Sequence, residues 1–587
     1  MRAFSSSASS PVRRLSPRIP EALFLFAVVF SPLAFGSTRP WSTAVVEIDL
    51  FLLFAACVLR GGAEGGGLVG KTLLPAVLGL LLLGVLQLLN PRSSLGPASL
   101  LPFTAAETAT RHDLLLWSSY AALLWSAPQV LADRDARRRF AWTLFGLGVL
   151  VAVVGVMQRG QGNGYYYGLF PVREGGPFGP FVNRDHAGAF LAMSACVGGG
   201  LFLSRWTGLR ERRASSAKID LAAAQALLLF VLGVTAFAVW DCRSRGGLNS
   251  FVLSLEVVSL TATGFIRRPG PRWTARAILF AAGLAYALFL VSHPIYFGDL
   301  FQTPDASTAL RLSFYRSSVA FLRDFPLWGT GLGSTRAAFR YYAEPLALGT
   351  HLMIDHVHSD WLEFGLEGGL FALLALGAGL GSFLFAILRD WRRELSFERR
   401  CLIAGALAAA VSFVLHEAVD FCFRTPADAV AFLSVLCYLG ALLGPKEPVA
   451  GRPAPVPLRA GAAAAALALA VLCVPPAASW IYLRRMGPAT PAARALLAAK
   501  AQAWEQTPET RFQLGAAALL VAESAAGAPA RARLLRAALP DLEAAWSRAP
   551  LDRRYNAFLG EDLDRLGSNA DAGVLLRRAR LLGQPLP

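Results

Sequence analysis

Four short polar clusters interrupt an otherwise apolar chain, and each combines residue types that bind anions or transfer protons. The guanidinium group of arginine is permanently charged and binds diphosphates through paired hydrogen bonds. Histidine titrates near neutral pH, so its imidazole can take a proton from a hydroxyl group. The clusters lie at residues 179–186 (GPFVNRDH), 241–247 (DCRSRGG), 310–316 (LRLSFYR) and 356–369 (HVHSDWLEFGLEGG).

The first cluster stands where an apolar run begins. Asn183 or Asp185 suits the N-cap of the helix that would start there. That structural role leaves Arg184 and His186 unexplained. We therefore expect Asn183, Arg184 and His186 to contact a substrate.

The second cluster forms a tight hairpin between two apolar runs and contains Arg243 and Arg245. These arginines either extend towards lipid head groups or bind an anionic ligand. We favour the ligand, because Gly246 and Gly247 let backbone N–H groups approach it. The following helix N-terminus would add positive potential.

The third cluster places Arg311 and Arg316 on an expected amphipathic helix at residues 307–323. A glycine-rich run follows at residues 329–334 (GTGLGS). It lacks the GxxxxGK[ST] pattern and a preceding strand, so it does not indicate a nucleotide site. We interpret it as a turn between the amphipathic helix and another helix.

The fourth cluster contains His356, His358 and Asp360 at the start of another apolar run. A His-x-His pair can bind zinc, but no third ligand follows at the usual spacing. Asp360 either caps the helix or contacts the substrate. A general base is the more natural role for one of the two histidines.

The elements that position these clusters are membrane-spanning helices. Of the 587 residues, 55% are hydrophobic and only 16% are charged, and the mean hydropathy is +0.47. A soluble domain is about a quarter charged. The net charge of +17 lies mainly in short breaks between the apolar runs, as expected for loops that orient membrane helices rather than for a nucleic-acid-binding protein.

The apolar runs predict an all-α, polytopic membrane protein of 12–13 transmembrane helices with a small helical C-terminal domain. With the N-terminus in the cytoplasm, the arginine-rich loops fall inside and all four clusters fall outside. The first run lacks a signal-peptide cleavage pattern and is expected to remain. The expected spans are 22–38, 42–59, 72–90, 114–131, 140–158, 186–205, 220–240, 247–265, 276–293, 362–388, 401–417, 428–444 and 460–482.

This topology divides the chain into five regions. They are a cytoplasmic tail (1–20), helices 1–9 (21–293), a large periplasmic loop (294–361), helices 10–13 (362–482) and a periplasmic helical domain (488–587). The last region resembles tetratricopeptide helix pairs, although no clean second repeat aligns. It is either a helical cap or a surface that binds a partner.

Cys242 and Cys422 both fall near the outer face, where a disulfide between them is one option.

The clusters, in this order, resemble the O-antigen ligase and polymerase superfamily of bacterial inner-membrane glycosyltransferases with a C-type fold. The resemblance covers about residues 20–445. It rests on residues 32–42 (PLAFGSTRPWS), 179–193 (GPFVNRDHAGAFLAM), 244–247 (SRGG), 311–334 (RLSFYRSSVAFLRDFPLWGTGLGS) and 358–369 (HSDWLEFGLEGG).

The resemblance implies a donor glycan on undecaprenyl diphosphate in the outer leaflet, and an acceptor hydroxyl that displaces the lipid diphosphate. It implies a metal-independent, inverting transferase without a cofactor. Arg245 and Arg311 match the family arginines assigned to the diphosphate, and His358 matches the histidine that activates the acceptor. Arg184 is a further diphosphate contact, and His356 is the rival base.

Three positions depart from the pattern of many relatives. Ser359 and Asp185 stand where asparagine is common, and Tyr315 stands where tryptophan is common. These changes leave the chemistry possible but put the contacts to sugar and lipid in doubt.

The resemblance leaves several functions open. A ligase transfers glycan to lipid A-core, a polymerase joins repeat units, and a third group are protein O-oligosaccharyltransferases. The C-terminal domain favours lipopolysaccharide or exopolysaccharide assembly, with export-machinery partners. A different class, a transporter or flippase for lipid-linked sugars, would carry charges deep inside spans and inverted repeats. We expect neither, and we expect membrane lipids but no nucleic acid as partners.

Overall fold

The computed structural model describes residues 16–61, 67–92, 95, 100–172, 176–211, 216–266, 268–292, 306–343, 354–390, 396–444, 454–525, 527–549 and 552–581. Most of the predicted cytoplasmic tail and two parts of the predicted large loop, residues 294–305 and 344–353, lie outside the described residues.

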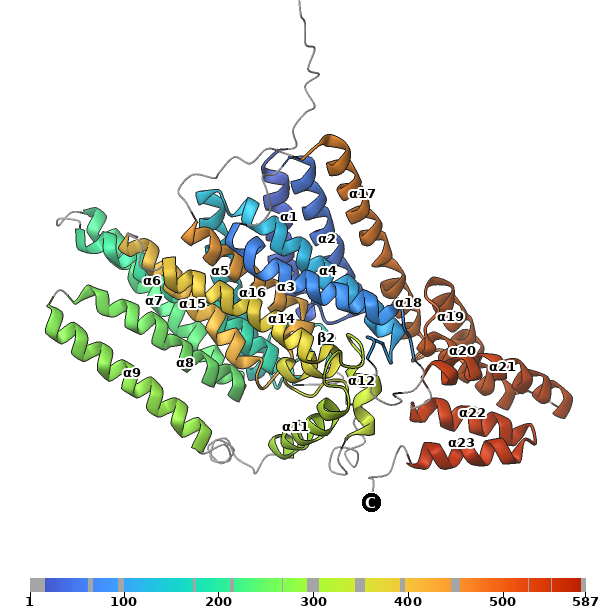
Figure 1. The fold of residues 1–587 in the computed structure, drawn as a ribbon. Helices are drawn as coiled ribbons and strands as arrows, with labels where there is room; N and C mark the ends of the chain where they lie inside the picture. Colours follow the sequence, from blue (N-terminus) through green and yellow to red (C-terminus); the bar gives the residue numbers. More distant parts are fainter. Residues whose placement is uncertain are drawn as a thin grey trace, which may run out of the picture.

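The described chain is almost entirely helical, and a bundle of long helices forms its main body (Figure 1). A two-stranded antiparallel hairpin, β1 (Tyr165–Tyr166) and β2 (Phe170–Pro171), lies between the fifth and sixth helices. The bundle helices are α1 (Arg18–Leu33), α2 (Pro40–Leu59), α3 (Gly67–Leu88), α4 (Glu107–Val130), α5 (Arg134–Gly160), α6 (Arg184–Glu211), α7 (Ser216–Asp241), α8 (Arg245–Ala262), α9 (Pro269–Ser292), α14 (Asp360–Asp390), α15 (Phe397–His416), α16 (Pro426–Leu443), α17 (Val456–Leu472) and α18 (Val474–Arg485).

Each of the thirteen predicted spans coincides with one of these helices, the last span being shared by α17 and α18. Among the described residues, nine helical segments are long and apolar enough to cross a membrane. They are α2, α3, α5, α6, α7, α14, α15, α16 and the α17–α18 segment. The prediction of an all-α, polytopic membrane protein is confirmed.

Small residues bring the central helices into close contact. Gly200 on α6 faces Gly405 on α15, and a Cβ atom added to Gly405 would lie 2.7 Å from the Cα atom of Gly200. Lipid offers no hydrophobic drive for helix association, so close backbone packing of this kind stabilises membrane bundles. The α6–α15 contact carries polar residues from both helices to the same end of the bundle.

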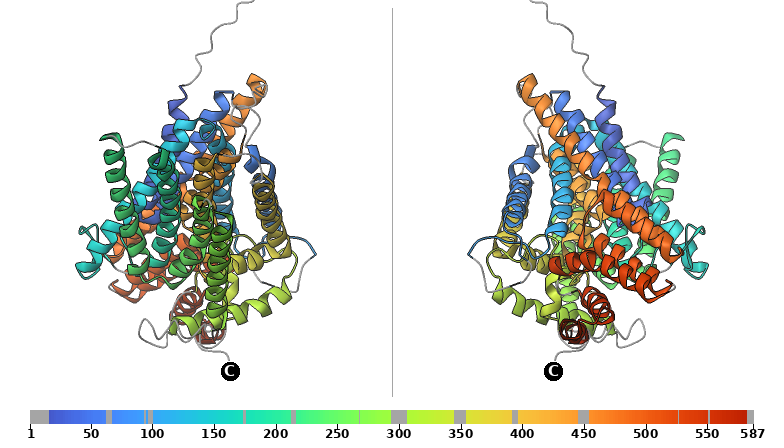
Figure 2. Two further views of the ribbon diagram at one scale, coloured as in Figure 1. Left: turned by 90° about the vertical axis from the view of Figure 1, so that its left-hand side faces the viewer. Right: turned by 90° about the vertical axis from the view of Figure 1, so that its right-hand side faces the viewer.

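Short helices gather at that end. They are α11 (Ala306–Asp324), α12 (Thr335–Ala338) and the C-terminal helices α19 (Pro491–Trp504), α20 (Pro508–Glu523), α21 (Ala528–Arg548), α22 (Arg553–Arg565) and α23 (Asn569–Leu581). The side views place the C-terminal helices and α11 at the same end of the bundle (Figure 2).

The C-terminal helices enclose a separate apolar core that includes Phe512, Leu542 and Tyr555. The helices expected near the C-terminus are present as α21, α22 and α23. Their similarity to tetratricopeptide repeats stays a prediction.

Two details differ from the sequence analysis. All seven cysteines are unpaired, so the optional disulfide between Cys242 and Cys422 is wrong. In addition, α2 buries Glu47 and Asp49 within a candidate span, although we expected charges only at the outer ends. Burial raises the cost of a charged carboxylate, so such residues are rare inside a bilayer.

The glycine-rich run forms the predicted turn between α11 and another helix, α12. Gly329, Gly331 and Gly333 have φ angles of 63°, 112° and 72°, which L-amino acids with side chains rarely adopt. A Cβ atom added to Gly329 would overlap the backbone of Glu367 in α14. The turn therefore lies directly on the helix that follows the His356–His358 segment.

We predict that Gly329→Ala lowers stability by at least 1–3 kcal/mol, roughly the cost of a strained φ angle alone. Gly377→Ala is the control, because a Cβ atom there would meet nothing within 4 Å. Thermal unfolding in detergent measures the difference. Equal melting temperatures for the two variants would contradict the close contact of the turn with α14.

Candidate functional site

The site is built around Asp420, which lies in the loop of residues 417–425 between α15 and α16. Its carboxylate is 1% exposed and faces three imidazoles. Its Oδ2 atom is 3.2 Å from Nε2 of His416 and 3.9 Å from Nε2 of His186, and its Oδ1 atom is 3.6 Å from Nδ1 of His358. Three separate segments therefore meet at one carboxylate.

Asp420 is held as an anion. Burial alone would raise the pKa of this carboxyl group, but His186, His358 and His416 together lower it well below its usual range. An ionised carboxylate beside Nδ1 favours the histidine tautomer with a proton on that nitrogen. In His358, this leaves Nε2 as the nitrogen that can accept a proton.

His358 is also held by contacts with α11. Its φ angle is 55°, and its carbonyl oxygen accepts a hydrogen bond of 3.0 Å from the hydroxyl group of Tyr315. Its ring lies parallel to Phe314, with the centroids 6.2 Å apart, and edge-on to Phe421. The side chain is 31% exposed, so the ring is fixed yet reachable from outside.

A group of arginines lies close to this histidine. Arg311 on α11 is one helical turn before Phe314 and Tyr315, and residues three and four apart share a helix face. Its Nη2 atom donates to Oδ2 of Asp185 at 3.2 Å. Arg245, at the start of α8, interacts electrostatically with Arg311, Asp185 and Arg184.

This guanidinium cluster, defined as Arg184, Arg245 and Arg311, carries three positive charges beside the carboxylate of Asp185. The N-terminus of α8 adds positive potential, and Ser244 caps that helix by accepting a 3.1 Å bond from the N–H of Gly247. This concentration of guanidinium groups suits an anionic ligand.

The remaining predicted residues occupy different positions. Asn183 is the N-cap, because its Oδ1 atom accepts a 2.9 Å bond from the N–H of Asp185. Arg184, Arg243 and Arg316 are exposed. His186 is buried, and its Nδ1 atom is 2.9 Å from the hydroxyl oxygen of Thr425. The prediction that these side chains contact a substrate stays a prediction.

His356 differs from His358 in its surroundings. Its ring stacks on Phe421 with a centroid distance of 4.0 Å, and its Nδ1 atom is 3.1 Å from Oε2 of Glu363. Burial, followed by the charge of Arg424, lowers the pKa of His356 to about 4. His356 is therefore neutral at physiological pH and a weak base.

Asp360 holds the loop in place. Its Oδ2 atom accepts a 2.8 Å bond from the N–H of Phe423. Its own N–H donates to the carbonyl oxygens of Glu417 and Asp420. These bonds fasten the loop of residues 417–425 to the start of α14, and a substrate contact for Asp360 stays a prediction.

The sequence analysis missed Asp420, His416 and Arg424. Arg424 is 11% exposed and ion-paired with both Asp113 of α4 and Glu367 of α14, which fixes the far side of the same loop. A signal was present in residues 416–425 (HEAVDFCFRT), which place four ionisable side chains, besides a cysteine, between two apolar runs. Such residues beside hydrocarbon indicate function.

Residues 187–377 match the model of the protein family described as O-antigen ligase. The match supports a likeness of this chain to the O-antigen ligase superfamily. The matched region extends from α6 into α14 and contains Arg245, Arg311 and His358, while Asp420 lies beyond it. A search of curated proteins finds no match. The family joins glycans at membranes, with a lipid-linked glycan donor and a glycan acceptor.

We predict that Arg424→Leu destabilises the protein by about 3–5 kcal/mol, because it leaves two buried carboxylates without their shared guanidinium. The control is Arg336→Ala, since Arg336 pairs with Asp355 at 3.1 Å where both side chains are more than half exposed. Exposed pairs contribute about 0–1 kcal/mol. Thermal unfolding in detergent compares the two variants. Equally small losses of stability in both would contradict a stabilising role for the ion pairs of Arg424.

Proposed function

We propose that this protein transfers a glycan from undecaprenyl diphosphate to an acceptor hydroxyl at the periplasmic face of the bacterial inner membrane. The observation that carries the proposal is the arrangement along α11. Arg311 belongs to the guanidinium cluster, and Phe314 and Tyr315, one turn later, contact His358. Helix α11 therefore carries an anion-binding group and, through Phe314 and Tyr315, positions the proton acceptor His358 beside it.

The guanidinium cluster would bind the diphosphate of the donor. When the sugar–phosphate bond breaks, negative charge builds up on the departing lipid diphosphate. Fixed guanidinium groups stabilise that charge in place of a metal ion, through paired hydrogen bonds. Arg311 and Arg245 take this role, and the exposed Arg184 adds a contact at the rim.

His358 would activate the acceptor. With a proton on Nδ1 facing Asp420, its Nε2 atom removes the proton from the acceptor hydroxyl as the oxygen attacks the anomeric carbon. Attack opposite the leaving diphosphate inverts the configuration of that carbon. His356 is less suited, because its low pKa and its contact with Glu363 make it a poor base.

The C-terminal helices support a role in handling the acceptor. Glu505 lies 2.5 Å from His112 at the start of α4, and Arg578 donates a hydrogen bond to Tyr341 beside α12. These contacts attach the C-terminal domain to α4 and to the segment that follows α12. We place the reaction in lipopolysaccharide or exopolysaccharide assembly, with export partners recruited by this domain.

The periplasmic orientation follows from charge. The loops at residues 133–139 and 389–400 are rich in arginine, and such loops stay in the cytoplasm. Counting spans from these loops places the guanidinium cluster and His358 on the opposite side of the membrane.

We predict that His358→Ala reduces glycan transfer by at least 10²-fold, the usual range for loss of a general base. His356→Ala should retain most of the activity. Transfer from a lipid-diphosphate glycan to candidate acceptors is measured in vitro with EDTA present, and size-exclusion chromatography confirms folding. The opposite order of loss in the two variants would identify His356 as the base.

A second prediction concerns the donor. Arg311→Lys keeps the charge but loses the planar fork, so it should raise the KM for the donor by about tenfold or more. Arg316→Lys is the matched control, because Arg316 is exposed on the same helix. An unchanged donor KM in Arg311→Lys would exclude a bidentate contact with the diphosphate.

A further inference from the structure

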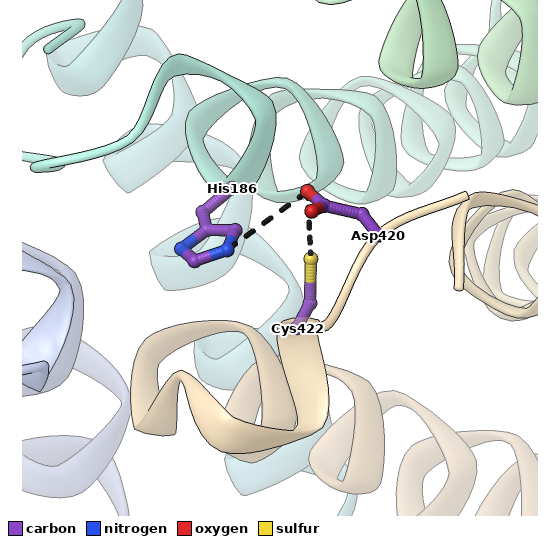
Figure 3. A group of neighbouring side chains, drawn as sticks. All are labelled: His186, Asp420 and Cys422. Carbon is purple, nitrogen blue, oxygen red and sulfur yellow. Dashed lines mark hydrogen bonds and ion pairs between the residues drawn. The ribbon is translucent and has the colours of Figure 1, made fainter. Parts of the chain in front are cut away.

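Three chemically different donor atoms converge beneath His358. They are Nε2 of His186 from α6, the carboxylate of Asp420 and Sγ of Cys422, both from the loop of residues 417–425 (Figure 3). All three residues are at most 4% exposed, and the donor atoms lie within 4.8 Å of one another. We propose that these residues bind a structural zinc ion.

The spacing of the donor atoms fits a tetrahedral zinc site after a small contraction. Oδ2 of Asp420 is 3.9 Å from Nε2 of His186 and 3.8 Å from Sγ of Cys422. Tetrahedral zinc places nitrogen, oxygen and sulfur ligands about 3.3–3.5 Å apart. Nε2 of His416 is 3.2 Å from the same Oδ2 atom but lies outside this group of three, so His416 would hold the carboxylate of Asp420 from beside the ion.

The orientation of His186 is an independent indication of a ligand. Its Nε2 atom is buried and lacks a hydrogen-bond partner within the described part of the chain. Its Nδ1 atom is bonded to the hydroxyl group of Thr425 at 2.9 Å, which fixes the ring with Nε2 towards Asp420. Zinc-binding histidines are held through their second nitrogen in this way.

Buried acidic groups around these donor atoms favour a bound cation, and the types of donor atom indicate which cation. Asp428, fully buried next to this loop, has two carboxylate oxygens without hydrogen-bond partners among the described residues. A divalent ion would offset this concentration of buried acidic groups. Mixed nitrogen, oxygen and sulfur donors select zinc over magnesium or calcium.

The ion would act on structure rather than on the reacting atoms. The three ligand residues are at most 4% exposed, so the ion would lie in the protein interior, away from the substrate. Asp420 would use Oδ2 for the ion and present Oδ1 to His358, 3.6 Å away. The zinc site is distinct from the His-x-His pair, and its existence does not depend on the proposed transfer reaction.

The test measures zinc in the purified full-length protein, after expression with zinc, removal of any affinity tag and dialysis against EDTA. Mass spectrometry of metals should find close to one zinc ion per chain. His186→Ala and Cys422→Ser should lose it, while Cys437→Ser, which changes a buried cysteine in α16, should keep it. Absence of zinc from the wild type, or full zinc in folded Cys422→Ser, would overturn the proposal.

Cobalt substitution keeps the proposal testable if the variants do not fold. Wild-type protein produced with cobalt in place of zinc should show thiolate-to-cobalt charge-transfer absorption, because Cys422 would supply a thiolate ligand. A cobalt-loaded protein without that absorption would exclude Cys422 as a ligand and contradict the site as proposed. Transfer activity is not used in either measurement, so failure here leaves the proposed function untouched.

Discussion

The ionised carboxylate of Asp420 in a buried setting is the constraint on which the rest of the site depends. Transferring such a charge out of water costs several kcal/mol unless it is paired. Here three imidazoles provide the pairing, and they come from α6, from the end of α15 and from the segment before α14. The need to satisfy one charge therefore fixes the relative positions of three segments that are far apart in the sequence.

Charge is distributed between two levels of the site. In the floor, Arg424 is only 11% exposed and is bound by two carboxylates, so it cannot be released to a ligand without a large cost. At the rim, Arg311 is about a quarter exposed and pairs with the carboxylate of Asp185. A diphosphate can compete for Arg311 and its neighbours but not for Arg424. This contrast separates the residues that hold the fold from those that we propose bind the substrate.

The sequence predicted the helices well, because runs of apolar residues have few alternatives in a membrane. It also predicted an N-cap at either Asn183 or Asp185, a role that Asn183 takes, and the turn at Gly329, because both follow from local chemistry. It did not predict the loop of residues 417–425, whose contacts join residues hundreds of positions apart, as in the approach of His186 to Asp420. Long-range pairing of this kind leaves no periodic pattern. The sequence did not predict the attachment of the C-terminal domain through Glu505 and Arg578 for the same reason.

The central claim is that donor binding and proton transfer belong to different residues placed side by side by α11. The most direct measurement is the equilibrium binding of a labelled undecaprenyl diphosphate to the purified protein and to His358→Ala, in the absence of acceptor. The account predicts the same Kd for both proteins, because the imidazole does not hold the diphosphate. A large loss of affinity in a folded His358→Ala variant would contradict this separation of roles.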